Sequence, residues 1–188
     1  MYRIVTKIES ITPYSSSRLH QEPQRTKEKP DDYDLRTWRC KAHVDDQGIV
    51  YIPGMAFKKC LDDAASRLGE KIPGKGQRTY PKHFTAGVLV ENNLSLGITQ
   101  DALEMVAVLC SAQGKRDGSG TRVIRRFPQV SRWSGTLTWA VLDSVITQDL
   151  FARYLKEAGA LVGVGRWRPA NGGLNGRFTA KIIEVIEC

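Results

Sequence analysis

Residues 133–186 have the sequence WSGTLTWAVLDSVITQDLFARYLKEAGALVGVGRWRPANGGLNGRFTAKIIEVI. At the start of this stretch, Trp133, Leu137, Trp139 and Val141 share one face, and hydroxyl side chains lie opposite them. An alternation with a period of two residues is typical of a half-buried strand. The stretch therefore begins with a predicted strand over residues 133–141.

An amphipathic helix is predicted to follow this strand. Thr147 is a suitable N-cap residue, because its side-chain oxygen can accept a hydrogen bond from the first helical turn. Apolar residues then recur at three- and four-residue spacing up to Gly159, which closes the predicted helix; they are Leu150, Phe151, Tyr154, Leu155 and Ala158. A glycine-rich segment, residues 163–177, leads to the last predicted strand, residues 178–186.

The N-terminal half of the chain contains the same kinds of segment. Strands are predicted over residues 2–11, 49–52 and 87–90. An apolar stripe predicts a helix that begins after Pro53 and ends at Gly69; it consists of Phe57, Cys60, Leu61, Ala64, Ala65 and Leu68. The order strand, helix, strand, strand, helix, strand predicts an α+β fold with a ferredoxin-like or RRM-like βαββαβ core. The length of the chain favours a single domain, residues 1–188, with long loop insertions.

Three polar stretches interrupt this core. Residues 13–46 contain several prolines and serines but few aliphatic residues, which predicts a mobile arm inserted after the first strand. Residues 110–122 form a predicted basic hairpin, or thumb, between the strand-like residues 101–109 and 122–130. Residues 70–86 form a further polar, basic loop.

Charge gives the first indication of function. The chain carries 28 Lys and Arg against 20 Asp and Glu, a net charge of +8, which favours a polyanionic partner. The four cysteines are too dispersed for a zinc site or a disulfide framework. Neither a signal-peptide h-region nor an apolar run of membrane-spanning length is present, so we expect a cytoplasmic protein with no membrane partner. No cofactor is expected.

The glycine-rich residues 163–177 are the strongest candidate for a binding site. They contain five Gly, three Arg and no acid. Glycines allow close approach of a ligand, and successive backbone N–H groups can hold an anion. Arg166, Arg168 and Arg177 can bind phosphates, and Trp167 offers a face on which a base can stack. A dinucleotide-binding motif is excluded, because such a motif follows a strand and opens a helix.

A second basic cluster lies between residues 111 and 132, where six Lys and Arg face one Asp. Cations interleaved with glycine and ending at Phe127 and Trp133 favour a groove that follows the backbone of a single strand. A third, weaker group lies between Lys71 and Lys82 and could extend this groove. The residues predicted to bind RNA are Lys58, Lys115, Arg116, Arg122, Arg125, Arg126, Arg166, Trp167, Arg168 and Arg177.

Two of these segments resemble a known family. The run IPGMAFKKCL, residues 52–61, is similar to the signature that opens the first helix of the RAMP superfamily, which comprises CRISPR-associated proteins with an RRM-like fold. Residues 163–176 are similar to the C-terminal glycine-rich loop of that superfamily. The sequence departs from the signature at Met55 and Ala56, which replace small hydroxyl residues, and at Cys60, which replaces Gly.

Within that superfamily the chain looks most like the backbone subunits that bind guide RNA (crRNA). The resemblance implies head-to-tail assembly along single-stranded RNA in a ribonucleoprotein effector complex of antiviral defence. The implied partners are guide RNA, target DNA or RNA, copies of the same chain and other effector subunits. In some relatives an Asp after the first strand cleaves RNA; Asp31 and Asp32 are the nearest candidates, but no motif aligns them.

Two other functions remain open. An endoribonuclease of the same fold would need a histidine or a paired acid at the groove, with His20 or His83 as the test positions. A single-stranded-DNA binding or annealing protein of a mobile element would have the same electrostatics, because only contacts to the 2′-hydroxyl distinguish RNA from DNA. The histidines are isolated and no catalytic motif is present, so we expect no intrinsic catalysis.

Overall fold

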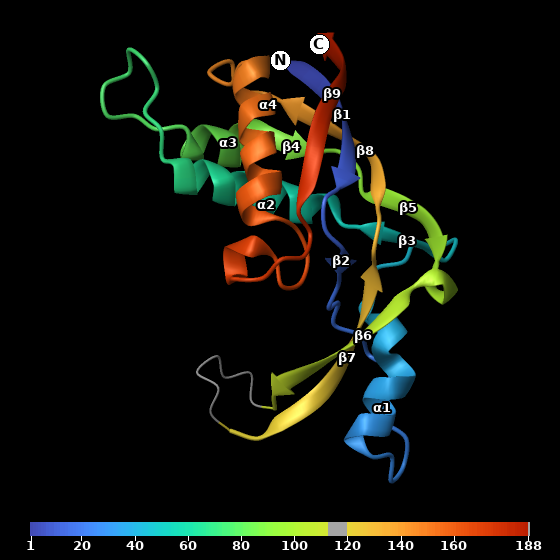
Figure 1. The fold of residues 1–188 in the computed structure, drawn as a ribbon. Helices are drawn as coiled ribbons and strands as arrows, with labels where there is room; N and C mark the ends of the chain where they lie inside the picture. Colours follow the sequence, from blue (N-terminus) through green and yellow to red (C-terminus); the bar gives the residue numbers. More distant parts are fainter. Residues whose placement is uncertain (113–119, 188) are drawn as a thin grey trace.

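The computed structural model describes residues 1–112 and 120–187. Two predicted RNA-binding residues, Lys115 and Arg116, lie outside the described residues. The centre of the fold is an antiparallel four-stranded sheet, shown in Figure 1. In spatial order its strands are β4 (Val88–Val90), β8 (Ser134–Val141), β1 (Tyr2–Ser10) and β9 (Phe178–Glu187).

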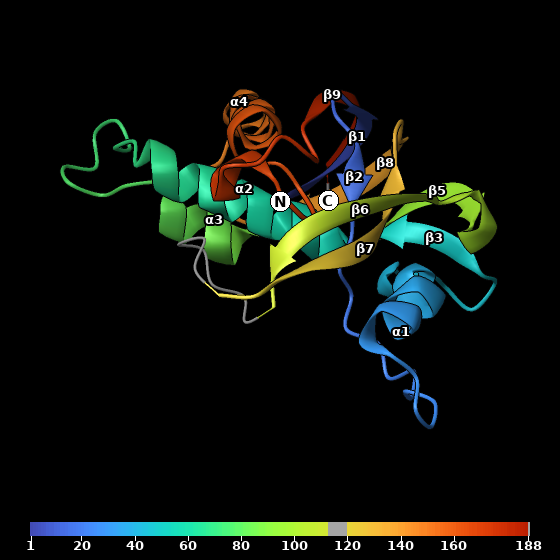
Figure 2. The same cartoon turned by 60° about the horizontal axis from the view of Figure 1, so that its bottom comes forward.

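Two helices, α2 (Gly54–Leu68) and α4 (Gln148–Glu157), cover one face of this sheet (Figure 2). With α2 following β1 and α4 following β8, the element order and strand order are those of a ferredoxin-like core. The fold predicted from the sequence is therefore confirmed. Within residues 1–112 and 120–187, no helix has both the length and the apolar composition needed to cross a membrane.

The core lies between the sheet and the two helices. Ile4 pairs with Trp139 across β1 and β8, and both side chains are fully buried. Thr6, which interrupts the apolar face of β1, is buried too, but its hydroxyl accepts a hydrogen bond from Trp139 Nε1 and donates one to the carbonyl of Leu137. Each large apolar side chain buried here contributes about 1.5–3 kcal/mol, so this layer dominates the stability of the domain.

The end of α4 differs from the sequence prediction. The helix continues past Gly159 as a π-helical turn, Ala158–Val162, and turns only at Gly163. Gly159 lies against β9: a Cβ at this position would come within 2.2 Å of the carbonyl oxygen of Phe178. Gly159 therefore permits close packing of a helix on a strand and does not end the helix.

A second, curved sheet projects from the core (Figure 1). It consists of β2 (Tyr14–Ser15), β7 (Arg122–Val130) and β6 (Glu104–Ser111), in that order. β6 and β7 form the long arms of the predicted basic hairpin, whose tip lies outside the described residues. A separate pair, β3 (Ile49–Ile52) and β5 (Leu94–Thr99), lies beside the core sheet. The sequence analysis did not predict β5 or the short helix α3 (Pro81–Gly87).

The inserted residues 13–46 are more structured than predicted. They contain α1 (Pro30–Thr37) and a 3-10 turn, Trp38–Lys41, although the composition predicted no regular structure. The segment is anchored by a small second core around Trp38 and by Asp34, which is 3% exposed. The carboxylate of Asp34 accepts hydrogen bonds from Lys41 Nζ and from the backbone N–H of Arg126 in β7. The low aliphatic content of residues 13–46 does not reveal such a polar anchor. The mobility of the arm stays a prediction.

Candidate nucleic-acid interface

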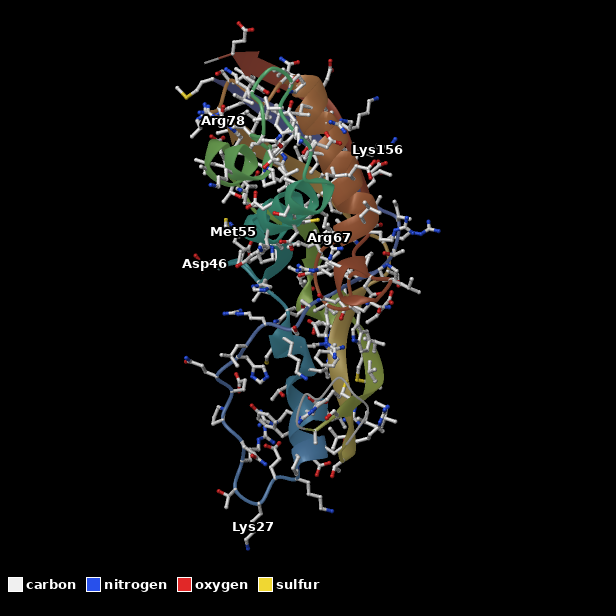
Figure 3. All side chains as sticks on the ribbon, turned by 90° about the vertical axis from the view of Figure 1, so that its left-hand side faces the viewer. Lys27, Asp46, Met55, Arg67, Arg78 and Lys156 are labelled. Carbon is white, nitrogen blue, oxygen red and sulfur yellow. The ribbon has the colours of Figure 1, made fainter. Side chains whose placement is uncertain are left out.

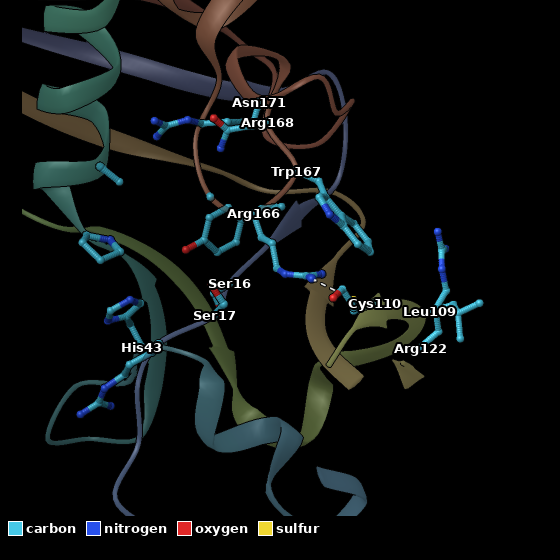
Figure 4. Close-up of a pocket in the computed structure, with 16 residues that line it drawn as sticks. Ser16, Ser17, His43, Leu109, Cys110, Arg122, Arg166, Trp167, Arg168 and Asn171 are labelled. Carbon is cyan, nitrogen blue, oxygen red and sulfur yellow. Dashed lines mark hydrogen bonds between the residues drawn. The ribbon is translucent and has the colours of Figure 1, made fainter. Parts of the chain in front are cut away.

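A groove with a volume of about 840 Å³ lies where the glycine-rich loop, the β6–β7 hairpin, the segment after β1 and the N-terminus of α2 meet (Figure 4). None of the described residues that line it is acidic. They are Tyr14, Ser16, Ser17, Arg18, His43, Pro53, Ala56, Leu109, Cys110, Ser111, Arg122, Gly165, Arg166, Trp167, Arg168 and Asn171.

Four arginines and a helix end make this groove electropositive. Arg18 and Arg122 are exposed, and Arg166 and Arg168 are half-buried. The first turn of the fifteen-residue helix α2 contains no acidic residue, and the side chain of Asn93 accepts a hydrogen bond from the N–H of Gly54 in this turn. The helix dipole at such an end favours anions. The site can therefore bind phosphate groups.

The glycine-rich loop is an ordered platform. The backbone N–H groups of Val164 and Gly176 donate to the carbonyls of Gly176 and Pro13 at 2.9 and 2.7 Å, and that of Arg166 donates to Ser15 at 2.7 Å. Gly176 has a φ of +71°, and a Cβ there would lie 1.7 Å from the carbonyl oxygen of Val164. This glycine allows the loop to fold across itself, whereas the sequence analysis had assigned the glycines to close approach of a ligand.

Arg166 is held between two aromatic rings. Its guanidinium carbon lies 3.3 Å from the centroid of the Phe127 ring and 4.0 Å from that of Trp167, and one of its nitrogens lies 3.5 Å from Cys110 Sγ. Burial lowers the pKa of Arg166, because the charge is partly desolvated. The cation–π contacts offset part of that cost, by up to about 2 kcal/mol. Trp167 has a φ of +55°, a strained conformation that brings its ring beside Arg166.

Three arginines of this loop have unpaired nitrogen atoms. Among the described residues, no acceptor lies within hydrogen-bond distance of the buried Arg166 Nη1, Arg168 Nε or Arg177 Nε. Arg168 also contacts Asp63 of α2 at 3.4 Å, and Arg177 lies outside the groove lining, beside Thr12. Leaving a buried donor unsatisfied costs about 1–3 kcal/mol, so these groups favour an anionic acceptor.

The hairpin arginines have different roles. Arg122 lines the groove, whereas Arg125 is half-buried on β7 and does not line it. Arg126 is bound to the inserted helix: its guanidinium donates to Asp31 at 2.7 Å, and its backbone N–H donates to Asp34 at 2.6 Å. The Arg126 guanidinium holds the pKa of Asp31 below its usual range. Asp31, considered above as a catalytic candidate, thus has a structural partner.

Lys58, which was predicted to bind RNA, is buried between α2 and α3. Its side chain is 5% exposed, its ammonium pairs with Asp62, and it also donates to the carbonyls of Phe84 and Thr85 at 3.2 Å. These contacts join α2 to α3. Binding RNA would require Lys58 to lose three partners, so its predicted role in RNA binding is inconsistent with its position.

The structure adds groove residues that sequence analysis missed. Ser16, Ser17, Arg18 and His43 come from the inserted segment, which β2 pins to Gln129 and Val130 of β7. Two-residue strand pairing leaves no detectable sequence pattern, so nothing in the sequence could have placed them. Burial, together with Arg18, lowers the pKa of His43 below 6.5.

The other histidines do not reach the groove. His83 Nδ1 donates to the carboxylate of Asp143 at 2.7 Å in a contact between α3 and the β8–α4 connection. His20 lies beside Tyr33, in a smaller hollow next to α1. In residues 1–112 and 120–187, no cluster of three or more His, Cys, Asp or Glu could hold a metal ion. The expectation of no catalysis stays a prediction.

The open face of the central sheet, opposite the helices, differs from the RNA-binding face of an RRM. An RRM stacks bases on aromatic side chains of its sheet. The side chains that alternate with the buried ones of β1 here are Arg3, Val5, Lys7 and Glu9, and the facing positions of β4, β8 and β9 are likewise free of aromatic residues. The groove, and not the sheet, is therefore the candidate interface.

Comparison with protein-family models finds no match, and neither does comparison with curated protein sequences. Solved structures do match. With a TM-score of 0.59 and 12% identity, 99% of this chain aligns with 61% of a chain in the cryo-EM structure of the Type III-B Cmr-beta bound to cognate target RNA. The chain thus spans less than two thirds of the length of that protein.

Two further structures match more distantly. The crystal structure of Cmr6 from Pyrococcus furiosus has a TM-score of 0.49 and 14% identity, over 96% of this chain and 99% of that one. A chain of a CRISPR RNA-guided surveillance complex has a TM-score of 0.38 and 12% identity, over 94% and 66%. At 12% identity the likeness to the first structure shows the fold alone: this chain shares the fold of a chain in the Type III-B Cmr-beta structure.

Proposed function

We propose that this chain is a guide-RNA-binding subunit of a CRISPR-type ribonucleoprotein effector complex, with single-stranded RNA in the groove. The observation that carries the proposal is a groove lined by four arginines and no described carboxylate, in which Arg166 is held between rings without an anionic partner among the described residues. A guanidinium fixed in advance loses little entropy when it binds a phosphate.

The fold supports the same proposal. The first matched structure contains target RNA, and the fold shared with it covers nearly the whole of this chain. The groove supports RNA over DNA, because the hydroxyls of Ser16 and Ser17 and the amide of Asn171 lie among its cations. Such groups can contact a 2′-hydroxyl. Assembly with further copies and with other effector subunits, head to tail along the RNA, is part of this proposal.

Base sequence plays a small part in the proposed binding. Trp167 lines the groove with its ring against the Arg166 guanidinium, and we infer that a base in the groove stacks on this ring. Stacking on an aromatic ring tolerates any base, and the arginines contact the phosphate backbone. A subunit of this kind holds the RNA while base pairing reads the sequence.

Fluorescence anisotropy with a labelled single-stranded RNA tests the proposal. The double variant Arg166→Gln and Arg168→Gln removes two charge-assisted contacts, so we expect RNA affinity to fall at least about tenfold, since each contact contributes about 1.5–3 kcal/mol. The affinity of the native chain should fall steeply as salt rises. The matched control is Lys7→Gln with Lys181→Gln, which removes two charges from the open sheet face.

The outcomes distinguish the candidate functions. Equal RNA affinities of the groove variant and the control variant contradict the proposed groove. Equal affinity for RNA and for DNA of the same sequence supports the single-stranded-DNA binding protein instead. Cleavage of the RNA by the native chain supports the endoribonuclease.

A further inference from the structure

A second basic surface lies at the opposite end of α2 from the groove. The loop that joins α2 to α3, with the first residues of α3, carries Lys71, Lys75, Arg78 and Lys82, all of them exposed. Pro53 and Ala56, at the start of α2, line the groove, and the helix has fifteen residues. At 1.5 Å per residue the loop begins about 22 Å away. From the sequence we expected that these residues could extend the groove; in the structure they lie at the other end of α2.

The charge of this loop is not neutralised by neighbouring acids. None of its four cations takes part in an ion pair among the described residues. The one acid at its base, Glu70, is bound by the guanidinium of Arg153, and this contact holds the pKa of Glu70 below its usual range. Four positive charges are therefore presented to solvent within twelve residues.

The loop is ordered, so it presents these charges in a fixed arrangement. Ile72 is buried at the base of the loop. Two backbone hydrogen bonds join the two sides of the loop: the N–H of Ile72 donates to the carbonyl of Arg78 at 2.8 Å, and the N–H of Tyr80 donates to that of Glu70 at 3.1 Å. Lys71 and Thr79 form a bridge across the loop. The tip projects away from the helices in Figures 1 and 2, and Arg78 of this loop is labelled in Figure 3.

The composition of the loop favours nucleic acid over a protein partner. Protein interfaces are centred on exposed aromatic or aliphatic anchors. No large apolar residue between Met55 and Leu89 is exposed, and the loop tip consists of Lys, Gly, Gln, Arg, Pro and Thr. Lysines and arginines without apolar neighbours suit the phosphate backbone of nucleic acid.

A path connects the groove to the loop. Arg168 and Asn171 line the groove and also line a shallow hollow beside α2, together with Ser66 and Arg67. Asp63, the one acid in that hollow, is paired with Lys59 and Arg168. Arg67 lies in the last turn of α2, four residues before Lys71. The cationic surface therefore continues along the helix.

We infer that the α2–α3 loop is a second phosphate-binding site, which holds the RNA strand that leaves the groove along α2. This inference rests on the proposed function. A stacked strand advances about 3.4 Å per nucleotide, so the distance along α2 corresponds to about six or seven nucleotides.

The test compares two lengths of RNA. An oligouridine of about four nucleotides fills the groove without reaching the loop, and one of about 14 nucleotides reaches both sites. The variant Lys75→Gln with Arg78→Gln should bind the long RNA about tenfold more weakly than the native chain, and should bind the short RNA equally well. Its salt dependence for the long RNA should decrease in slope by about 1.4, because two single-strand phosphate contacts are lost.

The control variant Lys7→Gln with Lys181→Gln removes the same charge and should show no dependence on RNA length. Unchanged binding of the long RNA by the loop variant, or an equal loss for both lengths, overturns the inference. Neither result affects the proposed function, which depends on the loss that Arg166→Gln and Arg168→Gln cause with the short RNA. Unchanged thermal unfolding of the loop variant confirms that it is folded.

Discussion

Two arginines on neighbouring parts of the molecule, Arg126 and Arg166, have opposite surroundings. Arg126 contacts two carboxylates of the inserted helix, Asp31 and Asp34, and helps to attach that helix to β7. Arg166 contacts the rings of Phe127 and Trp167 and no described carboxylate. In this pair the partner that the fold supplies decides the role: the carboxylates make Arg126 structural, whereas the aromatic rings hold Arg166 in place and leave its charge available to a ligand.

Asp34→Ala should give the largest effect on the structural side of this comparison. Asp34 is 3% exposed and accepts hydrogen bonds from Lys41 and from the backbone of Arg126. Its removal leaves the half-buried ammonium of Lys41 with only the carbonyl of Arg126 as a partner, and leaves the N–H of Arg126 without an acceptor, so we expect the free energy of unfolding to fall by about 3 kcal/mol. Chemical denaturation measures this loss.

We expect Asp34→Ala to change RNA affinity less than it changes stability, because Asp34 does not line the groove. Asp34→Asn is the control: it keeps the shape and one acceptor but removes the charge, and it should cost less than Asp34→Ala. A stability of Asp34→Ala equal to that of the native chain would show that α1 is not anchored through this carboxylate.

Two single variants, Arg126→Gln and Arg166→Gln, each remove one of the two arginines. Their expected effects on stability and on RNA affinity are smaller than the stability loss of Asp34→Ala. Arg126→Gln should lower the free energy of unfolding only slightly, because Asp31 is 62% exposed, and should leave RNA affinity unchanged. Arg166→Gln should weaken RNA binding about tenfold, the loss of one charge-assisted contact. Its stability should change by less than about 1 kcal/mol, because relief of desolvation opposes the loss of the cation–π contacts.

For both variants, anisotropy titration measures the RNA affinity and chemical denaturation measures the free energy of unfolding. The comparison between the two arginines fails if Arg126→Gln loses RNA affinity to the same extent as Arg166→Gln.

The two regions also differ in how far sequence could predict them. The βαββαβ core was predictable because its signal is local: alternation over residues 133–141 and helical spacing over residues 150–158 each indicate one buried face. The glycine-rich loop could be recognised from its composition alone, and in the structure it lines the groove with Arg166 and Arg168.

The partners of the arginines were not predictable. Asp34 meets Arg126 across 92 positions of sequence, and Arg166 meets Cys110 across 56. Contacts at such separation depend on how the hairpin and the inserted segment pack, and neither arrangement has a local pattern. Charge counting therefore predicted RNA binding for both Arg126 and Arg166, whereas in the structure Arg126 anchors the inserted helix and Arg166 lies in the groove.

The smallest expected effect concerns His43, the titratable side chain of the groove closest to neutrality. Burial and the neighbouring Arg18 lower its pKa from 6.5. The folded chain therefore binds this proton less readily than the unfolded chain. The stability that neutral His43 provides is complete above about pH 6.5 and decreases as the pH falls through that value toward the lower, folded-state pKa.

RNA binding should change in the opposite direction, because protonation of His43 adds a positive charge to the groove. A bound phosphate raises the pKa of His43, so RNA affinity should rise about twofold to threefold between pH 7.5 and pH 5.5, a change of well under 1 kcal/mol. Anisotropy at constant ionic strength measures the affinity, and His43→Gln should remove this rise. An identical pH dependence in the native chain and in His43→Gln would place His43 outside the path of the RNA and limit the groove to its arginine-lined side.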